Sequence, residues 1–175
     1  MYEALFKRIK STDFPLKCRG MYYFSKGRHA HQERKGSGFP YFVHPRGVAY
    51  IVMEHGGSVD QINAALAHDL LEDTETSYLE IMTVSNSEHC ADLCTELRNN
   101  EILKEEKGKE AYITEKLLNM SEDALLIKLA DMVYNSYDQP GEKALNRMYK
   151  NVCELLLKRK LNDKCKELAN LVILA

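Results

Sequence analysis

The sequence predicts an all-α protein, a compact bundle of several helices. Helix start and stop signals recur along the chain, and apolar residues repeat at spacings of three and four, whereas the alternation expected of strands is nearly absent. Apolar residues make up 45% of the 175 residues and charged residues 29%, which is typical of a globular chain with a proper core. With no repeat, low-complexity segment or linker, we expect a single domain over residues 1–175.

The first half of the chain predicts three longer helices separated by glycine-rich turns. Pro15 and Pro45 each suit the first turn of a helix, where the missing N–H costs nothing. Gly56 and Gly57 are stop signals, and GSGFP (36–40) reads as a turn. Helices are therefore expected from Thr12 or Asp13 to about 31, from His44 to 56, and from Ser58 or Asp60 to about 73.

The second half predicts further helices around one polar segment. The sequence RNNEILKEEKGKE (98–110) has no apolar periodicity and reads as a solvated loop. An apolar stripe in the penultimate helix reads as core packing and not as a cofactor site. The helices are expected over 77–84, 87–97, 109–120, 122–138, 142–160 and 162–174.

Composition excludes several classes of function. Lys and Arg number 24 and Asp and Glu 26, so the net charge of −2 gives no field to attract polymeric nucleic acid. No apolar run has the length of a membrane span, and the N-terminal segment lacks a secretory hydrophobic core. Five cysteines without a dense framework favour reduced thiols and a cytoplasmic protein. Cys90 and Cys94, with His89 beside them, lack further zinc ligands and are better explained as buried thiols.

The stretch ALAHDLLEDTET (65–76) places polar groups directly after the most apolar segment of the chain. His68 and Glu72 are four residues apart, as are Asp69 and Asp73, so in a helix all four lie on one side. Burying such groups without partners is expensive. A bound metal ion is therefore the first hypothesis.

Two more residues could complete a metal site from other helices. His44 precedes a helix-starting proline, and Asp131 is an acid within the apolar segment LIKLADMVYN. With His68 and Asp69 they make a set of two imidazoles and two carboxylates, which suits manganese, iron or zinc better than calcium. A divalent ion lowers the pKa of bound water, and Glu72 and Asp73 could then orient that water or transfer protons.

Each residue also has a structural explanation on its own. His44 could be a cap or a surface histidine, Asp131 could pair with Lys128 or Arg147, and the acidic cluster could be a frayed helix end. These explanations do not account for ligand-type residues on three separate helices.

Three segments together resemble a known family. HDLLEDT is similar to the signature of the HD-domain metal-dependent phosphohydrolases. HAHQERKGSGFPYFVHPRGVA (29–49), AALAHDLLEDT (64–74) and LLIKLADMVYN (125–135) resemble the hydrolase domain of RelA/SpoT-type alarmone enzymes. The similarity spans roughly residues 16–160, and the free-standing small alarmone hydrolases have about this length. The resemblance implies an HD-domain bundle with hydrolase activity only.

The resemblance also implies roles for individual residues. It implies hydrolysis of the 3′-pyrophosphate of guanosine 3′,5′-bispyrophosphate or its pentaphosphate form, giving GDP or GTP and pyrophosphate. Arg34 and Lys35, a pair of adjacent basic residues, would line the nucleotide pocket, and Asn135 would contact the ribose and phosphate region. Lys128 shares the face of Asp131 and could neutralise phosphate or merely compensate Asp131, and Arg147 could contact phosphate or be an ordinary surface arginine. The implied sets are His44, His68, Asp69 and Asp131 for the metal, usually manganese; Glu72 and Asp73 for catalysis; and Arg34, Lys35 and Asn135 for the substrate. Lys128 and Arg147 are added to the substrate candidates from the residues themselves.

The chain departs from the family pattern at ELRNNE (96–101), where Arg98 replaces a small hydroxyl residue. An arginine there could recognise an extra phosphate or block the usual base. The same chemistry on a dinucleotide cofactor phosphate, a nucleoside monophosphate or a deoxynucleotide therefore remains an alternative. A nucleotide-binding module without catalysis is another, and the oligomeric state is left open.

Overall fold

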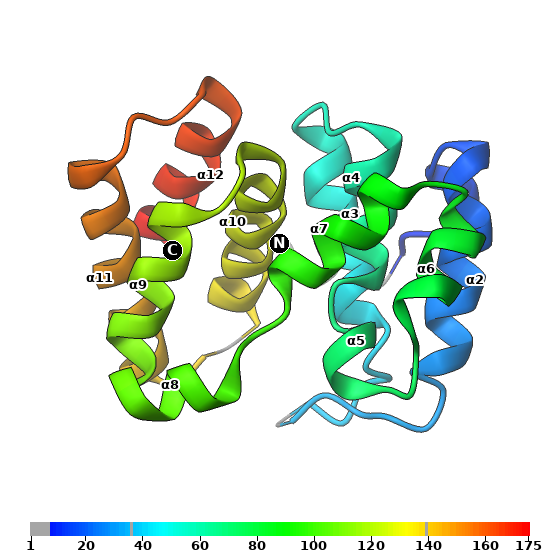
Figure 1. Cartoon of the computed structure of the whole chain (residues 1–175), viewed down its shortest axis with the longest axis horizontal. Coiled ribbons are helices and arrows are strands. Elements are labelled where there is room, and N and C mark those ends of the chain that lie inside the picture. Colours follow the sequence, from blue (N-terminus) through cyan, green and yellow to red (C-terminus); the bar gives the residue numbers. More distant parts are fainter. Residues whose placement is uncertain (1–7, 36, 139) are drawn as a thin grey trace. The chain divides into compact units, whose positions relative to one another are not determined.

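The computed structural model describes residues 8–35, 37–138 and 140–175, and the chain divides into two compact units, Met1–Arg98 and Asn99–Ala175. Helices build both units, as Figure 1 shows. Among the described residues, the β-type pairing is limited to one isolated bridge between Glu33 and Pro40. The all-α prediction is confirmed.

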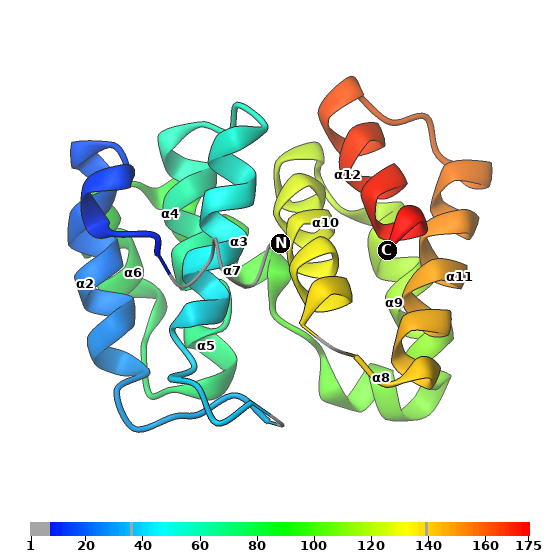
Figure 2. The ribbon, with the colours of Figure 1, turned by 180° about the vertical axis from the view of Figure 1, so that it is seen from behind.

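The first unit is organised around one buried helix. Helix α4 packs against α3, α7 and α2, and every residue from 61 to 67 within it is buried. In Figure 2 its ribbon lies beside that of α3. The elements are η1 (Ser11–Asp13), η2 (Leu16–Cys18), α2 (Arg19–Arg28), α3 (Val43–Glu54), α4 (Val59–Ala67), α5 (Leu70–Asp73), α6 (Tyr78–Ser85) and α7 (Glu88–Leu97).

A capping box and a glycine fix the start of α4. The Ser58 hydroxyl accepts from the Gln61 N–H at 3.2 Å, and the Gln61 side chain accepts from the Ser58 N–H at 2.7 Å, which satisfies two donors at the helix start. A Cβ added to Gly57 would lie 2.4 Å from Val52 Cγ1 and 2.8 Å from Val52 O, so only glycine lets the chain turn this closely against the end of α3. The close packing of these two helices determines where the residues at the end of α4 lie.

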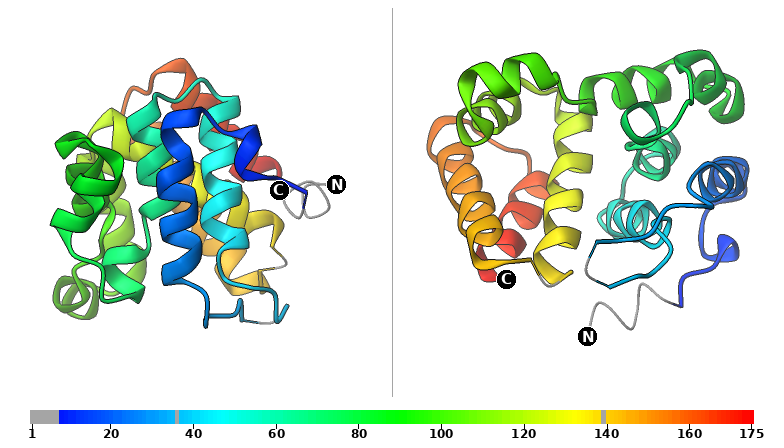
Figure 3. Two further views of the ribbon diagram at one scale, coloured as in Figure 1. Left: turned by 90° about the vertical axis from the view of Figure 1, so that its right-hand side faces the viewer. Right: turned by 90° about the horizontal axis from the view of Figure 1, so that it is seen from below.

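The second unit consists of five helices in the described part of the chain. Helix α10 packs on α12, and α11 packs on both α9 and α12. In Figure 2 the yellow ribbon of α10 runs alongside the red ribbon of α12, and Figure 3 gives two further views. The elements are α8 (Glu101–Lys107), α9 (Lys109–Asn119), α10 (Glu122–Tyr137), α11 (Glu142–Lys158) and α12 (Asp163–Leu174).

Three sequence-based expectations about helix boundaries are wrong. The first long helix begins at Arg19, because Phe14 and Pro15 have extended backbone and only single 3-10 turns precede it. The helix expected up to residue 73 is interrupted at His68 and Asp69. The expected loop over 98–110 contains α8, which Asn100 caps by accepting from the Leu103 N–H.

No described helix has the length and apolar character needed to cross a membrane.

Candidate metal centre

Three metal-type side chains converge within the first unit. His44 lies in the first turn of α3, and His68 and Asp69 form the two-residue break between α4 and α5. One ligand atom from each of the three lies within 4.8 Å of the others. Both histidines are buried, whereas Asp69 is partly exposed. Among the residues that the structure describes, this is the one such group of His, Cys, Asp or Glu.

The separations between these donors suit one ion. Asp69 Oδ2 lies 3.5 Å from His44 Nε2 and 3.3 Å from His68 Nε2. Nitrogen and oxygen ligands bound at about 2.0–2.2 Å stand roughly 3–3.5 Å apart around a tetrahedral or octahedral ion. The three side chains therefore fit a divalent metal.

The tautomer of His68 also suits metal binding. Its Nδ1 lies 2.8 Å from the carbonyl oxygen of Ala65, and a carbonyl can only accept, so the N–H is at Nδ1. The lone pair is then at Nε2, on the side of Asp69 Oδ2. Metal-binding histidines commonly donate their other N–H in this way, which fixes the orientation of the ring.

The two predicted catalytic acids follow immediately, on α5. Glu72 and Asp73 are both exposed at the surface of the unit. Partial withdrawal from water, and then the nearby charge of Asp69, raise the pKa of Asp73 above its ordinary value. A carboxyl with a raised pKa beside a cluster of metal-type ligands is suited to proton transfer.

Tyr41 links this acid to the metal cluster. Its hydroxyl lies 2.7 Å from Asp69 Oδ2 and 3.0 Å from Asp73 Oδ2. Burial, and then the charge of Asp69, raise the pKa of Tyr41, so the phenol keeps its proton and acts as a donor. The tyrosine ring also packs against two imidazole rings, with its centroid 4.8 Å from that of His29 and 5.9 Å from that of His44.

The predicted basic pair lies on the loop that carries Tyr41. The Arg34 N–H donates to the Phe39 carbonyl at 2.8 Å, which pairs the two sides of this loop. The Arg34 guanidinium lies 5.7 Å from the centre of the Tyr41 ring. Arg34 is thus placed beside the metal cluster, and Lys35 follows it at the turn.

The other predicted ligand, Asp131, lies in the second unit on α10. Its Oδ2 accepts from Lys128 Nζ at 2.7 Å, and its Oδ1 accepts from Asn135 Nδ2 at 2.6 Å. The predicted shared face of these three residues is therefore present, and so is the compensating ion pair. The role of Asp131 as a fourth ligand stays a prediction.

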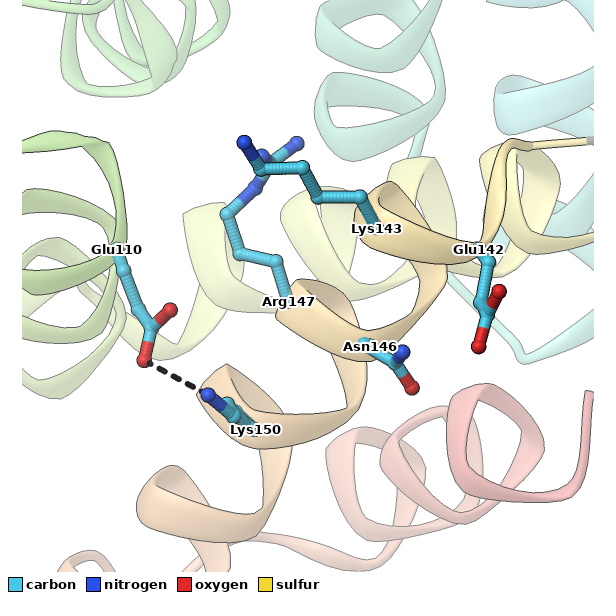
Figure 4. Close-up of a pocket in the computed structure, with 6 residues that line it drawn as sticks. All are labelled: Glu110, Glu142, Lys143, Asn146, Arg147 and Lys150. Carbon is cyan, nitrogen blue, oxygen red and sulfur yellow. Dashed lines mark ion pairs between the residues drawn. The ribbon is translucent and has the colours of Figure 1, made fainter.

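Arg147 also lies in the second unit, on the wall of an open pocket of about 390 Å³. Figure 4 shows Lys143 and Arg147 reaching from α11 to one side, while Lys150 turns toward Glu110 on α9, at 3.7 Å. Partial burial, and then the positive charges of Arg147, Lys104 and Lys128, lower the pKa of Lys109. The second unit thus holds positive groups whose mutual repulsion an anion would relieve.

Sequence reasoning missed Tyr41 and its supports, Gln32 and His29. All three lie within HAHQERKGSGFPYFVHP, but the pattern gives no sign that a tyrosine hydroxyl would bridge two acids. The available signal was the position of Tyr41, two residues before the start of α3, because a side chain there lies close to His44.

Comparison with known proteins gives the family. A model described as "HD domain" matches residues 22–151, which is most of the chain. The chain belongs to the HD domain family. A solved structure entitled "A metazoan ortholog of SpoT hydrolyzes ppGpp and plays a role in starvation responses" has the same HD-domain fold. It matches with a TM-score of 0.74 at 23% identity, over 91% of this chain and 95% of that one.

Curated relatives of this HD domain share more sequence. Guanosine-3′,5′-bis(diphosphate) 3′-pyrophosphohydrolase MESH1 of Xenopus tropicalis is 35% identical over 118 residues, or 66% of this chain and 65% of the frog protein. The human MESH1 protein gives the same identity and coverage. Guanosine-3′,5′-bis(diphosphate) 3′-pyrophosphohydrolase of Aquifex aeolicus is 50% identical over 60 residues, which is 34% of this chain and 8% of that protein. The matched region thus spans about 65% of the length of the MESH1 proteins.

Proposed function

We propose that the chain is a metal-dependent hydrolase that removes the 3′-pyrophosphate of guanosine 3′,5′-bispyrophosphate or its pentaphosphate form. The observation that carries the proposal is the convergence of His44, His68 and Asp69 at separations suited to one ion. The names of the MESH1 relatives support the choice of substrate. The products would be GDP or GTP and pyrophosphate.

The metal would be held by His44, His68 and Asp69, with Asp131 as a fourth ligand from α10. We propose manganese, with zinc and iron as alternatives, because mixed imidazole and carboxylate sets suit these ions. A divalent ion held there would supply Lewis acidity to the phosphoryl group and lower the pKa of water. The match of the family model to residues 22–151 spans both units, which supports their working as one domain.

The proton chemistry is assigned to Glu72 and Asp73. Hydrolysis joins the oxygen of water to the phosphorus and breaks the bond between that phosphorus and the ribose 3′-oxygen. One proton leaves the water and one is gained by the ribose oxygen. Asp73, which lies next to Asp69 through Tyr41, would take the first proton, and Glu72 would help to deliver the second.

Substrate binding is assigned to basic and amide side chains of both units. Arg34 and Lys35 would hold the nucleotide beside the metal cluster, and Asn135 would donate to the ribose and phosphate region. Lys128 and Arg147 would neutralise phosphate charge, and the lowered pKa of Lys109 beside them supports a local excess of positive charge. We expect the enzyme to act in the cytoplasm, in agreement with its free cysteines.

The test is product analysis by chromatography. Purified protein with manganese is incubated with guanosine 3′,5′-bispyrophosphate and a panel of other nucleotides, with Asp69→Ala as the control. Pyrophosphate and GDP should appear only with metal and with intact Asp69. If the alarmone survives every condition, the proposed substrate is wrong.

A second candidate is the same reaction on another phosphorylated nucleotide. Arg98, an exposed residue at the end of α7, favours it because the family pattern has a small hydroxyl residue there. Cleavage of a dinucleotide cofactor phosphate, a nucleoside monophosphate or a deoxynucleotide in the same panel would identify this case. Binding of a nucleotide that persists after chelation, with no cleavage, would instead indicate a binding module.

A further inference from the structure

One tyrosine hydroxyl lies between a metal-type carboxylate and a catalytic carboxylate. The single proton of Tyr41 is shared between Asp69 Oδ2 at 2.7 Å and Asp73 Oδ2 at 3.0 Å. Two carboxylates held this close to one hydroxyl repel each other. A donor between them reduces that repulsion and gives both side chains one orientation.

Hydrogen bonds across the loop hold Tyr41 in place. The Tyr41 N–H donates to the Gln32 carbonyl at 2.8 Å, and the Gln32 side chain donates to the Asp73 carbonyl at 2.6 Å. The Gln32 amide oxygen in turn lies 2.7 Å from Nδ1 of the buried His29. The loop is therefore tied to the end of α5 by main-chain and side-chain bonds, so the tyrosine is oriented before any ligand arrives.

We propose that Tyr41 is a positioning residue that sets Asp69 for metal binding and Asp73 for proton transfer in a single arrangement. The kinetic part of this inference rests on the proposed hydrolase function, whereas the metal-binding part does not. Removing the hydroxyl takes away one of the contacts that orient Asp69 toward His44 and His68, and it takes away the bond that aligns Asp73. Both effects come from one atom.

The test is Tyr41→Phe, which removes only that atom. The ring remains, so its contact with Arg34 at 5.7 Å is preserved. A matched control is Tyr78→Phe, because the Tyr78 hydroxyl also donates to a carboxylate, Asp92 Oδ1 at 2.8 Å, which belongs to no metal-type group. Circular dichroism verifies that both variants melt cooperatively.

Three quantities are measured for each variant. The manganese dissociation constant, from electron paramagnetic resonance of the free ion, should rise about 10- to 100-fold in Tyr41→Phe, as for other partners of metal ligands. At saturating manganese, kcat should fall by about 10-fold or more, while KM changes by less than about twofold, because nucleotide contacts are unchanged. Tyr78→Phe should match the wild type in all three quantities. Equal manganese affinity and kcat in Tyr41→Phe and Tyr78→Phe would overturn the proposal.

A double variant distinguishes the effect of Tyr41 on Asp69 from its effect on Asp73. In Asp73→Asn the bond from Tyr41 to Asp69 can still form, so adding Tyr41→Phe should still weaken manganese binding in this background. Manganese affinity that Tyr41→Phe leaves unchanged in the Asp73→Asn background would show that Tyr41 does not act on Asp69, and the inference fails. If the wild type cleaves no nucleotide but the manganese effect is present, the proposed function fails and the role of Tyr41 toward the metal stands.

Discussion

A single oxygen atom, Oδ2 of Asp69, is in contact with three other side chains at the metal cluster. His44, His68 and Tyr41 all reach it within 3.5 Å. Because this carboxylate lies between two imidazole nitrogens, its charge is what would attract a cation to the group. The effect of neutralising it is therefore predictable.

Asp69→Asn should weaken manganese binding by more than about 100-fold, which exceeds the usual effect of changing an outer partner of a ligand. The amide keeps the shape of the carboxylate but not its charge. Isothermal titration with manganese measures the change, and Asp60→Asn, in the first turn of α4, is the control. Unchanged binding in Asp69→Asn would contradict the assignment of the metal centre.

Buried thiols give the protein a defined response to alkaline pH. Burial, and then the nearby thiol of Cys90, raise the pKa of Cys18 from 9.0 to about 11, and burial with the Glu122 charge raises that of Cys165 to about 11. An acid with a folded pKa above its unfolded value loses its proton first in the unfolded chain. The free energy of unfolding should therefore fall as the pH rises from about 9 to about 11.

Each thiol should contribute at most about 3 kcal/mol to this fall. Cys18→Ala should show a shallower loss of Tm between pH 8 and pH 11 than the wild type, whatever its Tm at neutral pH. Thermal melts followed by circular dichroism across about this pH range measure the slopes. Parallel slopes for the two proteins would contradict the prediction.

The three residues that cluster in the first unit could be predicted from the sequence, but the residues that support them could not. His68 and Asp69 were found from their place after an apolar run, and His44 from its place before a proline. The Tyr41 hydroxyl bridges Asp69 and Asp73, which lie far from it in the sequence. The spacing of apolar residues along a chain does not predict a contact of that kind.

At the scale of elements, the two glycines 27 and 57 should respond in opposite directions to alanine. Gly57→Ala would place a Cβ against Val52 and should cost about 1–3 kcal/mol of the free energy of unfolding. Gly27→Ala lies in α2 with nothing within 4 Å of the added Cβ, and should stabilise by about 0.5–1 kcal/mol. Urea denaturation of both variants measures the difference. A loss of stability in Gly27→Ala would contradict the open space around Gly27.

Most helices could be predicted from their caps, and the errors have physical causes. Ser58, Ser77 and Ser87 each cap a helix whose start the sequence placed within a residue or two. Helix α8 was missed because it lacks an apolar stripe, and an Asn100 cap with a Glu101–Lys104 ion pair at 2.8 Å accompanies it instead. The break at His68 and Asp69 interrupts a sequence with ordinary helical preferences, so tertiary structure and not propensity explains it.

The proposed fourth ligand, Asp131, can be tested by its effect on metal binding. If Asp131 is the fourth ligand, Asp131→Ala should weaken manganese binding by more than about 10-fold. Asp163→Ala, in the first turn of α12, should have no effect. Titration of both variants with manganese makes the comparison, and equal affinities would restrict the metal site to the first unit.

Metal removal should lower the stability of the whole chain. A ligand at 100 times its dissociation constant stabilises the folded state by about 2.7 kcal/mol. Adding a chelator to the manganese-loaded protein should therefore lower Tm, and Asp69→Asn should show no such shift. A Tm that changes with neither manganese nor chelator would contradict a metal site that exists only in the folded protein.

The position of the donors along the chain has a consequence for biosynthesis. His44, His68 and Asp69 all belong to the first unit, which ends before α8 begins. The first unit is synthesised first and can begin to fold before the second unit emerges from the ribosome. The nascent chain would present three ligands before the residues of α10 are synthesised, so the divalent ions available during translation would influence which metal the finished protein carries.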